Sequence, residues 1–300
     1  MRQNIELNAA AMLYKQRDWQ SLLYLGLQPL LMLYLWQTGL TSTINKLLFC
    51  LLLFLTLGIS VIHHNHCHLH IWRNKQFNRM TDIWITLLQG HPTFVFYPAH
   101  IANHHRYHHG PKDVARTYRF GSDSNNLLGY VLHPLQAAWV LYPLFITWLS
   151  RLKQRKSAVF YYCLRQYIVM ALAWCLLAMI DYHKFLTFIL MPQLHGLHWL
   201  LATNYLQHAH ADGHSRINFA RNFEGWVNPL LFNIGLHTAH HRHPRVHWSE
   251  LSTLHPRYRQ QVDPRLNAGP LLAYMFRTYF LSLFHTRWRS QSLMQHHKDV

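Results

Sequence analysis

The chain has 300 residues, half of them hydrophobic and only 13% of them charged. Because a soluble domain carries about twice that share of charged residues, the composition argues against an ordinary soluble protein and favours the lipid bilayer. The formal net charge of +17 suits nucleic acid, an anionic membrane face or an acidic protein. The basic residues lie between apolar runs and no nucleic-acid recognition motif occurs. We therefore favour the membrane face and expect no nucleic-acid partner.

Two apolar runs lie near the start of the chain, at 21–36 and 47–62, with a polar turn at 37–46 between them. Each run is slightly short of the ~20 residues that span a bilayer, but tolerant flanking residues extend it. The pair predicts a transmembrane helical hairpin. The residues before it contain no short apolar core followed by a cleavage site, so we expect no cleavable signal peptide.

The segment 63–126 is polar, basic and rich in histidine. The positive-inside rule places it on the cytoplasmic side. The amino-terminal tail carries Arg2, Lys15 and Arg17, which places that tail on the same side. Two crossings return the chain to the side from which it started, so the two placements agree.

Three further apolar runs follow, at 127–149, 158–180 and 185–203. Four basic residues between the first two of these runs predict a cytoplasmic loop there. We therefore interpret 127–149, which Pro134 and Pro143 interrupt, as an interfacial or re-entrant helix. The other two runs are interpreted as a second transmembrane hairpin.

These elements predict an all-α membrane protein with two transmembrane helical hairpins, and hence four crossings, in one domain over residues 1–300. Residues 204–300 are expected to return to the cytoplasm and complete a His-rich cap. The amphipathic stretch 271–284 is expected to be an interfacial or packing helix. Both termini of this multi-pass protein are then cytoplasmic, and we expect a bacterial inner membrane. The four cysteines form no CxxC pair, so no disulfide framework is predicted.

The 27 histidines gather in clusters that are separated along the chain. This spread excludes both an expression tag and a single low-complexity metal-binding tract. The four clusters span residues 63–70, 100–109, 204–214 and 237–244.

Helical spacing places histidines of the first cluster on shared faces. If the second apolar helix continues into this cluster, His64 and His68 lie one turn apart. His66 and His70 have the same spacing on another face, so the register stays open.

The later clusters repeat this one-turn spacing. His100 and His104 share a helix face, and His105 is offset from His104 by about 100°. Such an arrangement lets neighbouring rings reach two different metal ions. The other two clusters contain the same spacing at Asn204 and His208 and at His237, His240 and His241.

Neutral imidazole is a good ligand for iron, copper, zinc and nickel. Eight or nine imidazoles from these clusters could hold two metal ions and leave an open position on each ion for oxygen or water. Chance matches to any one motif are common in a chain this rich in histidine. Four clusters on one predicted membrane face are much stronger evidence.

The arrangement resembles the membrane fatty-acid desaturase superfamily, which also contains hydroxylases and carotenoid ketolases. The resemblance covers roughly residues 20–255 and includes the sequence context FNRMTDIW after the first cluster and NPLLFNIGLHTAHHRHPRVHW around the last. The matching motifs are His64-x-x-x-His68, His100-x-x-x-His104-His105, Asn204-x-x-x-His208 and His237-x-x-His240-His241.

This resemblance implies a non-haem centre of two iron ions, cycling between Fe2+ and Fe3+, with O2 as co-substrate and a fatty-acyl lipid as substrate. It implies that Asn204 stands near one metal through a water molecule. It also implies a separate electron-donor protein of the ferredoxin, rubredoxin or cytochrome b5 type, which we expect to be acidic and to dock on the basic cytoplasmic face. The implied ligands are His64, His68, His100, His104, His105, Asn204, His208, His237, His240 and His241.

Other functions remain as alternatives. A fatty-acyl hydroxylase or a carotenoid-type oxygenase would use the same metal centre, and the sequence does not separate them from a desaturase. A metal transporter is a more distant alternative, because transport sites lie at ionisable residues inside membrane spans, whereas these clusters begin where the apolar runs end.

Several residues near the clusters are expected to support the metal ligands. Scarce acids can orient imidazoles by accepting their hydrogen bonds, although each acid can equally be an ordinary surface residue. These acids are Asp82, Asp113, Asp212 and Glu224. Most of the remaining cluster histidines are expected to be supporting or surface residues, namely His66, His70, His108, His109, His210, His214 and His243. Histidines inside apolar runs are expected to be core residues, namely His133, His195 and His198.

Overall fold

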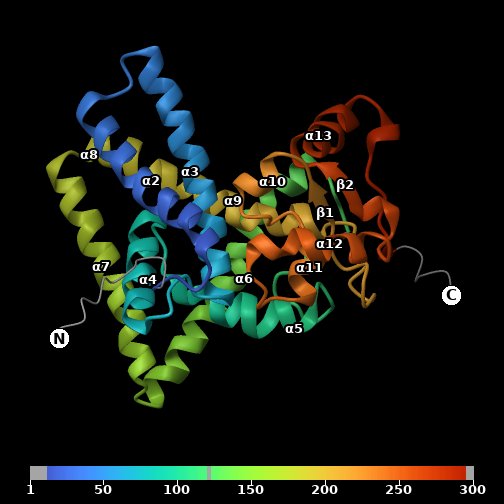
Figure 1. Cartoon of the computed structure of the whole chain (residues 1–300), viewed down its shortest axis with the longest axis horizontal. Coiled ribbons are helices and arrows are strands. Elements are labelled where there is room, and N and C mark those ends of the chain that lie inside the picture. Colours follow the sequence, from blue (N-terminus) through green and yellow to red (C-terminus); the bar gives the residue numbers. More distant parts are fainter. Residues whose placement is uncertain (1–11, 120–122, 295–300) are drawn as a thin grey trace, which may run out of the picture. The chain divides into compact units, whose positions relative to one another are not determined.

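The computed structural model describes residues 12–119 and 123–294, which are mostly helical (Figure 1). The chain divides into two compact units. Unit 1 comprises Met1–Thr93 and Tyr161–Gly196, and unit 2 comprises Phe94–Phe160 and Leu197–Val300. The predicted single domain over 1–300 stays a prediction.

Unit 1 is built around long helices. Its elements are η1 (Gln16–Asp18), α2 (Trp19–Thr38), α3 (Thr43–His68), α4 (Lys75–Gln89), most of α7 (Ala158–Ile180), α8 (Tyr182–Lys184), η4 (Phe185–Leu190) and the start of α9 (Met191–His208). The short helix η2 (Thr93–Val95) lies at its boundary.

The turn between α2 and α3 has recognisable local causes. Gly39 ends α2 with φ +69°, a left-handed conformation that suits glycine. The Ser42 side chain then caps α3 by accepting a hydrogen bond from the Asn45 backbone N–H at 3.1 Å. The Asn45 amide nitrogen in turn donates to the Gly39 carbonyl oxygen at 2.8 Å, which ties the end of one helix to the start of the next.

Three helical stretches of the described residues are long and apolar enough to cross a membrane, at Thr43–His68, Ala158–Ile180 and Tyr182–His208. The helix α2 covers the first predicted run but is not among them, because three glutamines and a proline within it lower its mean hydropathy. The structure therefore supports a mostly helical protein with three candidate membrane spans. The four crossings and their hairpin topology stay predictions.

Unit 2 contains the long helix α6 (Leu127–Gln154) and, besides it, mostly short elements. In chain order, its elements are η3 (Tyr97–His104), α5 (His105–Tyr107), α6, the end of α9, β1 (Asn222–Glu224), α10 (Val227–Leu230), α11 (His237–Arg242), η5 (Trp248–Glu250), α12 (Leu251–Arg259), η6 (Pro264–Leu266), β2 (Asn267–Pro270), α13 (Leu271–Met275), η7 (Phe276–Phe280), η8 (Leu281–Leu283) and η9 (Thr286–Trp288).

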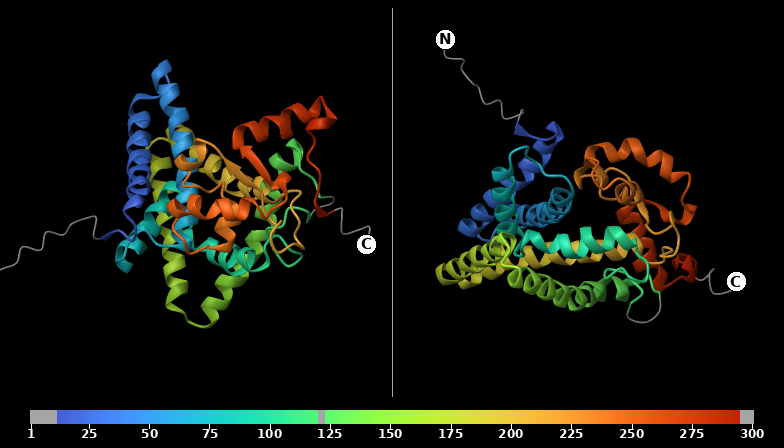
Figure 2. Two further views of the ribbon diagram at one scale, coloured as in Figure 1. Left: turned by 45° about the vertical axis from the view of Figure 1, so that its right-hand side comes forward. Right: turned by 90° about the horizontal axis from the view of Figure 1, so that it is seen from below.

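The helix α6 runs without a break through Pro134 and Pro143. An internal proline removes a backbone hydrogen bond, but the remaining turns of this 28-residue helix hold it together. Its start lies beside the last turns of α9 (Figure 2), where the Tyr205 hydroxyl donates to the Ser124 carbonyl oxygen at 2.6 Å. An interfacial or re-entrant position for this helix stays a prediction.

The strands β1 and β2 form a small parallel sheet in which Asn222 faces Asn267 and Glu224 faces Pro270. Sequence analysis did not predict it, since strands of three and four residues give no alternating pattern. One residue of β1, Phe223, belongs to a buried core of unit 2, which is made by Tyr130, Ala202, Tyr205, Leu206, Ala209, Phe223, Tyr274 and Tyr279.

The packing of α2 against α3 generates a test with two glycines. A Cβ at Gly58 would lie 2.4 Å from the Tyr24 ring, whereas a Cβ at Gly26 would meet nothing within 4 Å. We expect Gly58→Ala to lower the free energy of unfolding by about 1–3 kcal/mol, as overpacking does. Gly26→Ala should raise it by up to about 1 kcal/mol, since alanine favours the helix.

Thermal unfolding of both variants in one detergent measures this difference. The close packing of the two helices would be contradicted by equal melting temperatures for the two variants.

Candidate metal centre

Two histidines of the second cluster, His100 and His104, lie on a π-helical turn. The element η3 is a π-helix that ends at His104, and α5 begins at His105. The wider turn brings both residues beside His100, with ring centroids 5.2 Å and 4.6 Å away. π-Helical turns are uncommon and often occur at functional sites. This geometry sends His104 and His105 into two different groups of histidines.

The first group, here called the buried cluster, consists of His104, His208, His237 and His241. All four side chains are buried, and each offers a ring nitrogen that lies within 4.8 Å of the others. They come from η3, from the end of α9 and from α11. Residues separated by more than 130 positions in the sequence thus meet in one place.

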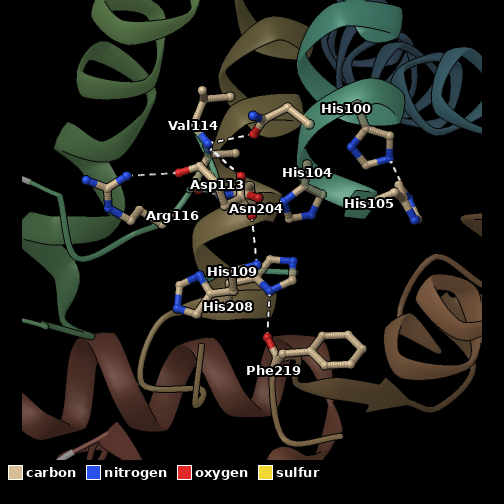
Figure 3. Close-up of polar contacts among 12 residues, drawn as sticks. His100, His104, His105, His109, Asp113, Val114, Arg116, Asn204, His208 and Phe219 are labelled. Carbon is tan, nitrogen blue, oxygen red and sulfur yellow. Dashed lines mark hydrogen bonds and ion pairs between the residues drawn. The ribbon is translucent and has the colours of Figure 1, made fainter. Parts of the chain in front are cut away.

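Two members of the buried cluster have assignable tautomers. The Nδ1 atom of His104 lies 2.6 Å from a carboxylate oxygen of Asp113, and Nδ1 of His208 lies 2.8 Å from the Phe219 carbonyl oxygen. Because both oxygens can only accept, each Nδ1 carries the proton. When such a ring is neutral, its Nε2 atom therefore carries a lone pair that is available to a metal ion. Figure 3 shows the two rings and their acceptors.

The Nε2 atoms of the buried cluster converge on His237. The Nε2 atoms of His208 and His241 each lie 3.0 Å from Nε2 of His237. One ring nitrogen carries either a proton or a lone pair, so it completes at most one good hydrogen bond of the two. A shared cation would relieve the remaining repulsion.

A second group, here called the η3 cluster, repeats this pattern with His105 at its centre. The Nε2 atoms of His100 and His240 each lie 3.1 Å from Nε2 of His105. The two clusters adjoin, because the rings of His105 and His241 stack with centroids 4.3 Å apart. Their ring nitrogens, together with one from His108, lie within 4.8 Å of one another.

The donor sets of both clusters fit metal ions. Imidazole nitrogens bind metals at about 2.1 Å, and two such nitrogens at right angles around one ion lie about 3.0 Å apart. The observed separations of 3.0 Å and 3.1 Å match that spacing. An all-imidazole set suits iron, copper, zinc or nickel.

The protonation state of His241 favours metal binding by the buried cluster. Burial, followed by the charges of neighbouring histidines, holds the pKa of His241 well below its ordinary value. Its neutral form, which is the form that binds metal, is therefore favoured.

The carboxylate of Asp113 is fully buried and orients the buried cluster. One oxygen accepts from His104 and from the His109 backbone N–H at 2.8 Å, and the other accepts from the Ala115 backbone N–H at 2.7 Å. Burial alone would raise the pKa of Asp113, but its electrostatic interaction and hydrogen bond with His104, together with the hydrogen bond from the Ala115 backbone N–H, outweigh burial and lower that pKa. The expectation that Asp113 orients an imidazole is confirmed.

The register of the first cluster can be assigned within unit 1. The Ile71 backbone N–H donates to Nδ1 of His66 at 3.2 Å, and Nε2 of His66 lies 3.6 Å from Asp82. His66 is therefore used in the packing of α3 against α4. The alternative pair, His64 and His68, lies with its rings 5.0 Å apart, and its role as ligands stays a prediction.

Asn204 makes two polar contacts within unit 2. Its amide nitrogen donates to the Ala115 carbonyl oxygen at 2.7 Å and lies 3.3 Å from Nε2 of His133. Its predicted position near a metal through water stays a prediction. His133 is buried, as expected, but it faces this asparagine.

The other candidate acids contact different partners. The carboxylate of Asp82 accepts from the Tyr162 hydroxyl at 2.6 Å, and that of Asp212 accepts from the His214 backbone N–H at 2.8 Å. Glu224 binds His255 and Arg259 at 2.9 Å and 2.8 Å. None of these contacts involves a predicted ligand.

Two features of the site were missed by sequence analysis. The Phe219 carbonyl oxygen orients His208, and a backbone acceptor has no signal in side-chain spacing. His109 was expected to be a supporting or surface residue, but it is fully buried and stacks on His208 with centroids 5.3 Å apart. A run of adjacent histidines at a helix end does not show which of them turns inward.

Comparison with known families identifies one match. The family model described as fatty acid desaturase matches residues 42–269, a range that contains every predicted ligand. Comparison with curated proteins gave no match.

The environment of Asp113 generates a test by Asp113→Asn. The carboxylate of Asp113 accepts hydrogen bonds from three N–H donors. In the variant, the amide NH2 group must face at least one of these donors and cannot accept its hydrogen bond. We therefore expect metal affinity to fall about 10- to 100-fold, as it does when the partner of a ligating histidine is lost. Metal retained after a graded chelator challenge measures the change.

Asp263→Asn is the matched control, since that carboxylate pairs with the exposed Arg265. Equal metal retention by the two variants would contradict the role of Asp113.

Proposed function

We propose that this chain, which belongs to the fatty acid desaturase family, desaturates a fatty-acyl chain with O2 at a histidine-ligated centre of two iron ions. Family membership makes it an oxidoreductase-type enzyme, and its three apolar helices make it an integral membrane protein. The finer assignment depends on one observation. Two adjoining groups of imidazoles each have a central Nε2 atom held about 3 Å from two others.

The residues that would hold the ions follow from these groups. The buried cluster would hold one ion, through the ligands His104, His208, His237 and His241. The η3 cluster would contribute His100, His105 and His240 to the other. The sequence motif adds His64 and His68 to the ligand set, and it adds Asn204 near one ion through a water molecule. Iron that cycles between Fe2+ and Fe3+ would supply the electrons that oxygen activation requires.

The chain's own residues would prepare the centre. Asp113 and the Phe219 carbonyl oxygen hold His104 and His208 in the tautomer that presents Nε2. Burial of the cluster excludes water and keeps His241 neutral. Acyl-chain desaturation removes two hydrogens from adjacent methylenes, so a site shielded from water would protect it from side reactions.

The membrane setting matches a lipid substrate. The helix α7 is the candidate span that the protein covers least, with 11% of its most apolar stretch buried. Its apolar side chains are therefore available to lipid. We propose four crossings with the histidine clusters and both termini in the cytoplasm, in a bacterial inner membrane.

Electrons would come from a separate protein of the ferredoxin, rubredoxin or cytochrome b5 type. The net charge of +17 favours an acidic partner, because complementary charge speeds encounter. A hydroxylase would use the same imidazoles, so the reaction product is the deciding observation.

The first test is expression in a bacterium, followed by lipid analysis with gas chromatography and mass spectrometry. The wild-type chain should produce a new unsaturated acyl chain that is absent with His241→Ala or His105→Ala, which remove one imidazole from each cluster. His183→Ala is the control, since this exposed histidine lies outside both clusters. It should leave the product unchanged.

Iron content of the purified proteins gives a second readout that needs no electron donor. We expect roughly two irons per chain in the wild type, as in other two-metal sites, and a loss of iron in both cluster variants. A hydroxylated product would reassign the reaction, whereas iron-free wild-type protein would sink the di-iron proposal.

A further inference from the structure

The stretch α13–η7–η8 exposes an apolar stripe on unit 2. Every side chain of this stripe is more than half exposed. The rings of Phe276 and Phe280 lie 5.3 Å apart, and those of Phe280 and Phe284 lie 5.6 Å apart, so the stripe is continuous. Its members are Leu272, Phe276, Phe280, Leu283 and Phe284.

The opposite face of this stretch is fixed to the core of unit 2. Tyr274 and Tyr279 are 7% and 3% exposed, and both contact Asn125. The amide nitrogen of Asn125 donates to the Tyr274 hydroxyl at 2.6 Å, and the Tyr279 hydroxyl donates to the amide oxygen of Asn125 at 3.1 Å. The Arg221 guanidinium lies 4.9 Å from the Tyr274 ring centroid. Rotation of the stretch to hide the stripe would break these contacts.

The stretch Leu271–Leu283 is apolar but too short to be a membrane span. A helix of this length extends about 20 Å, whereas the hydrocarbon core is about 30 Å thick. An apolar face on such a helix suits burial at the level of the lipid headgroups, parallel to the membrane.

The charged residues of the chain segment that contains the stripe have one sign. No aspartate or glutamate occurs between residues 264 and 298, while Arg277 lies within this stretch and Arg287 and Arg289 follow it. The Arg287 guanidinium lies 5.0 Å from the Trp288 ring centroid, and tryptophan favours the headgroup region. Basic residues beside an interfacial helix attract anionic lipids.

We propose that the apolar stripe is a docking surface for an anionic phospholipid bilayer, which anchors unit 2 to the membrane surface. The stripe inserts among the acyl chains near the headgroups, and the three arginines contact lipid phosphates. A second copy of the chain would also cover an apolar stripe, but it would carry the same basic residues and repel them. This inference does not depend on the reaction that the enzyme catalyses.

Spin labels test the proposal in the full chain, after its four cysteines are replaced. A nitroxide at Phe280→Cys or Phe276→Cys reports on the stripe, and one at Ser252→Cys reports on an exposed polar face of α12. The protein is placed in nanodiscs of mixed phosphatidylglycerol and phosphatidylcholine. Accessibility to oxygen, which concentrates in lipid, is then compared with accessibility to a water-soluble nickel complex.

Both stripe labels should favour oxygen over nickel, whereas the label at 252 should favour nickel. In nanodiscs of phosphatidylcholine alone, the preference for oxygen at 276 and 280 should weaken. Three results would overturn the proposal: nickel accessibility at 276 and 280 equal to that at 252, dipolar broadening between stripe labels on two copies, or no dependence on lipid charge.

Discussion

Imidazole nitrogens that face one another in a buried space are the constraint on which the metal centre depends. A ring nitrogen can offer one proton or one lone pair, so a nitrogen with two neighbours near 3 Å leaves one contact unsatisfied. In water, solvent molecules would hydrogen-bond to such a nitrogen, but the four rings of the buried cluster are shielded from solvent. A bound cation would turn the same contacts from repulsive into attractive, and its binding would then stabilise unit 2.

Much of the surrounding structure serves this arrangement. The π-helical η3 directs His104 and His105 into separate clusters, and the chain after it turns back so that Asp113 reaches His104. The small sheet contributes on the other side, where the Asn222 side chain accepts from the Thr238 backbone N–H at 2.9 Å and so holds the start of α11. Each cluster depends on irregular backbone held by hydrogen bonds.

Spacing along the sequence predicted those structural features that depend on residues close together in the chain. Apolar runs predicted the long helices, and one-turn spacing predicted that His237 and His241 would meet. The expected pair of His100 and His104 is divided between the two clusters, because the π-helical turn places His100 against His105 instead. Spacing left the choice between His64 and His66 open, because both have a partner one turn away. The structure packs His66 toward Asp82, and the role of His64 as a ligand stays a prediction. Spacing also missed the parallel sheet and the Phe219 carbonyl oxygen, since backbone groups carry no side-chain signal. The proline-containing α6 was expected to be interrupted, but a long helix tolerates the missing hydrogen bonds.

The order of the two units along the chain has a consequence for biosynthesis. Neither unit is continuous, because residues 94–160 of unit 2 lie between the two parts of unit 1. During synthesis the histidines of η3 emerge early, but α11 follows more than a hundred residues later. At ordinary elongation rates of about 5–20 residues per second, the imidazoles of η3 are therefore without their α11 neighbours for about 7–27 s. The complete imidazole set exists only after α11 has been synthesised, so neither cluster can assemble before the chain between η3 and α11 has emerged.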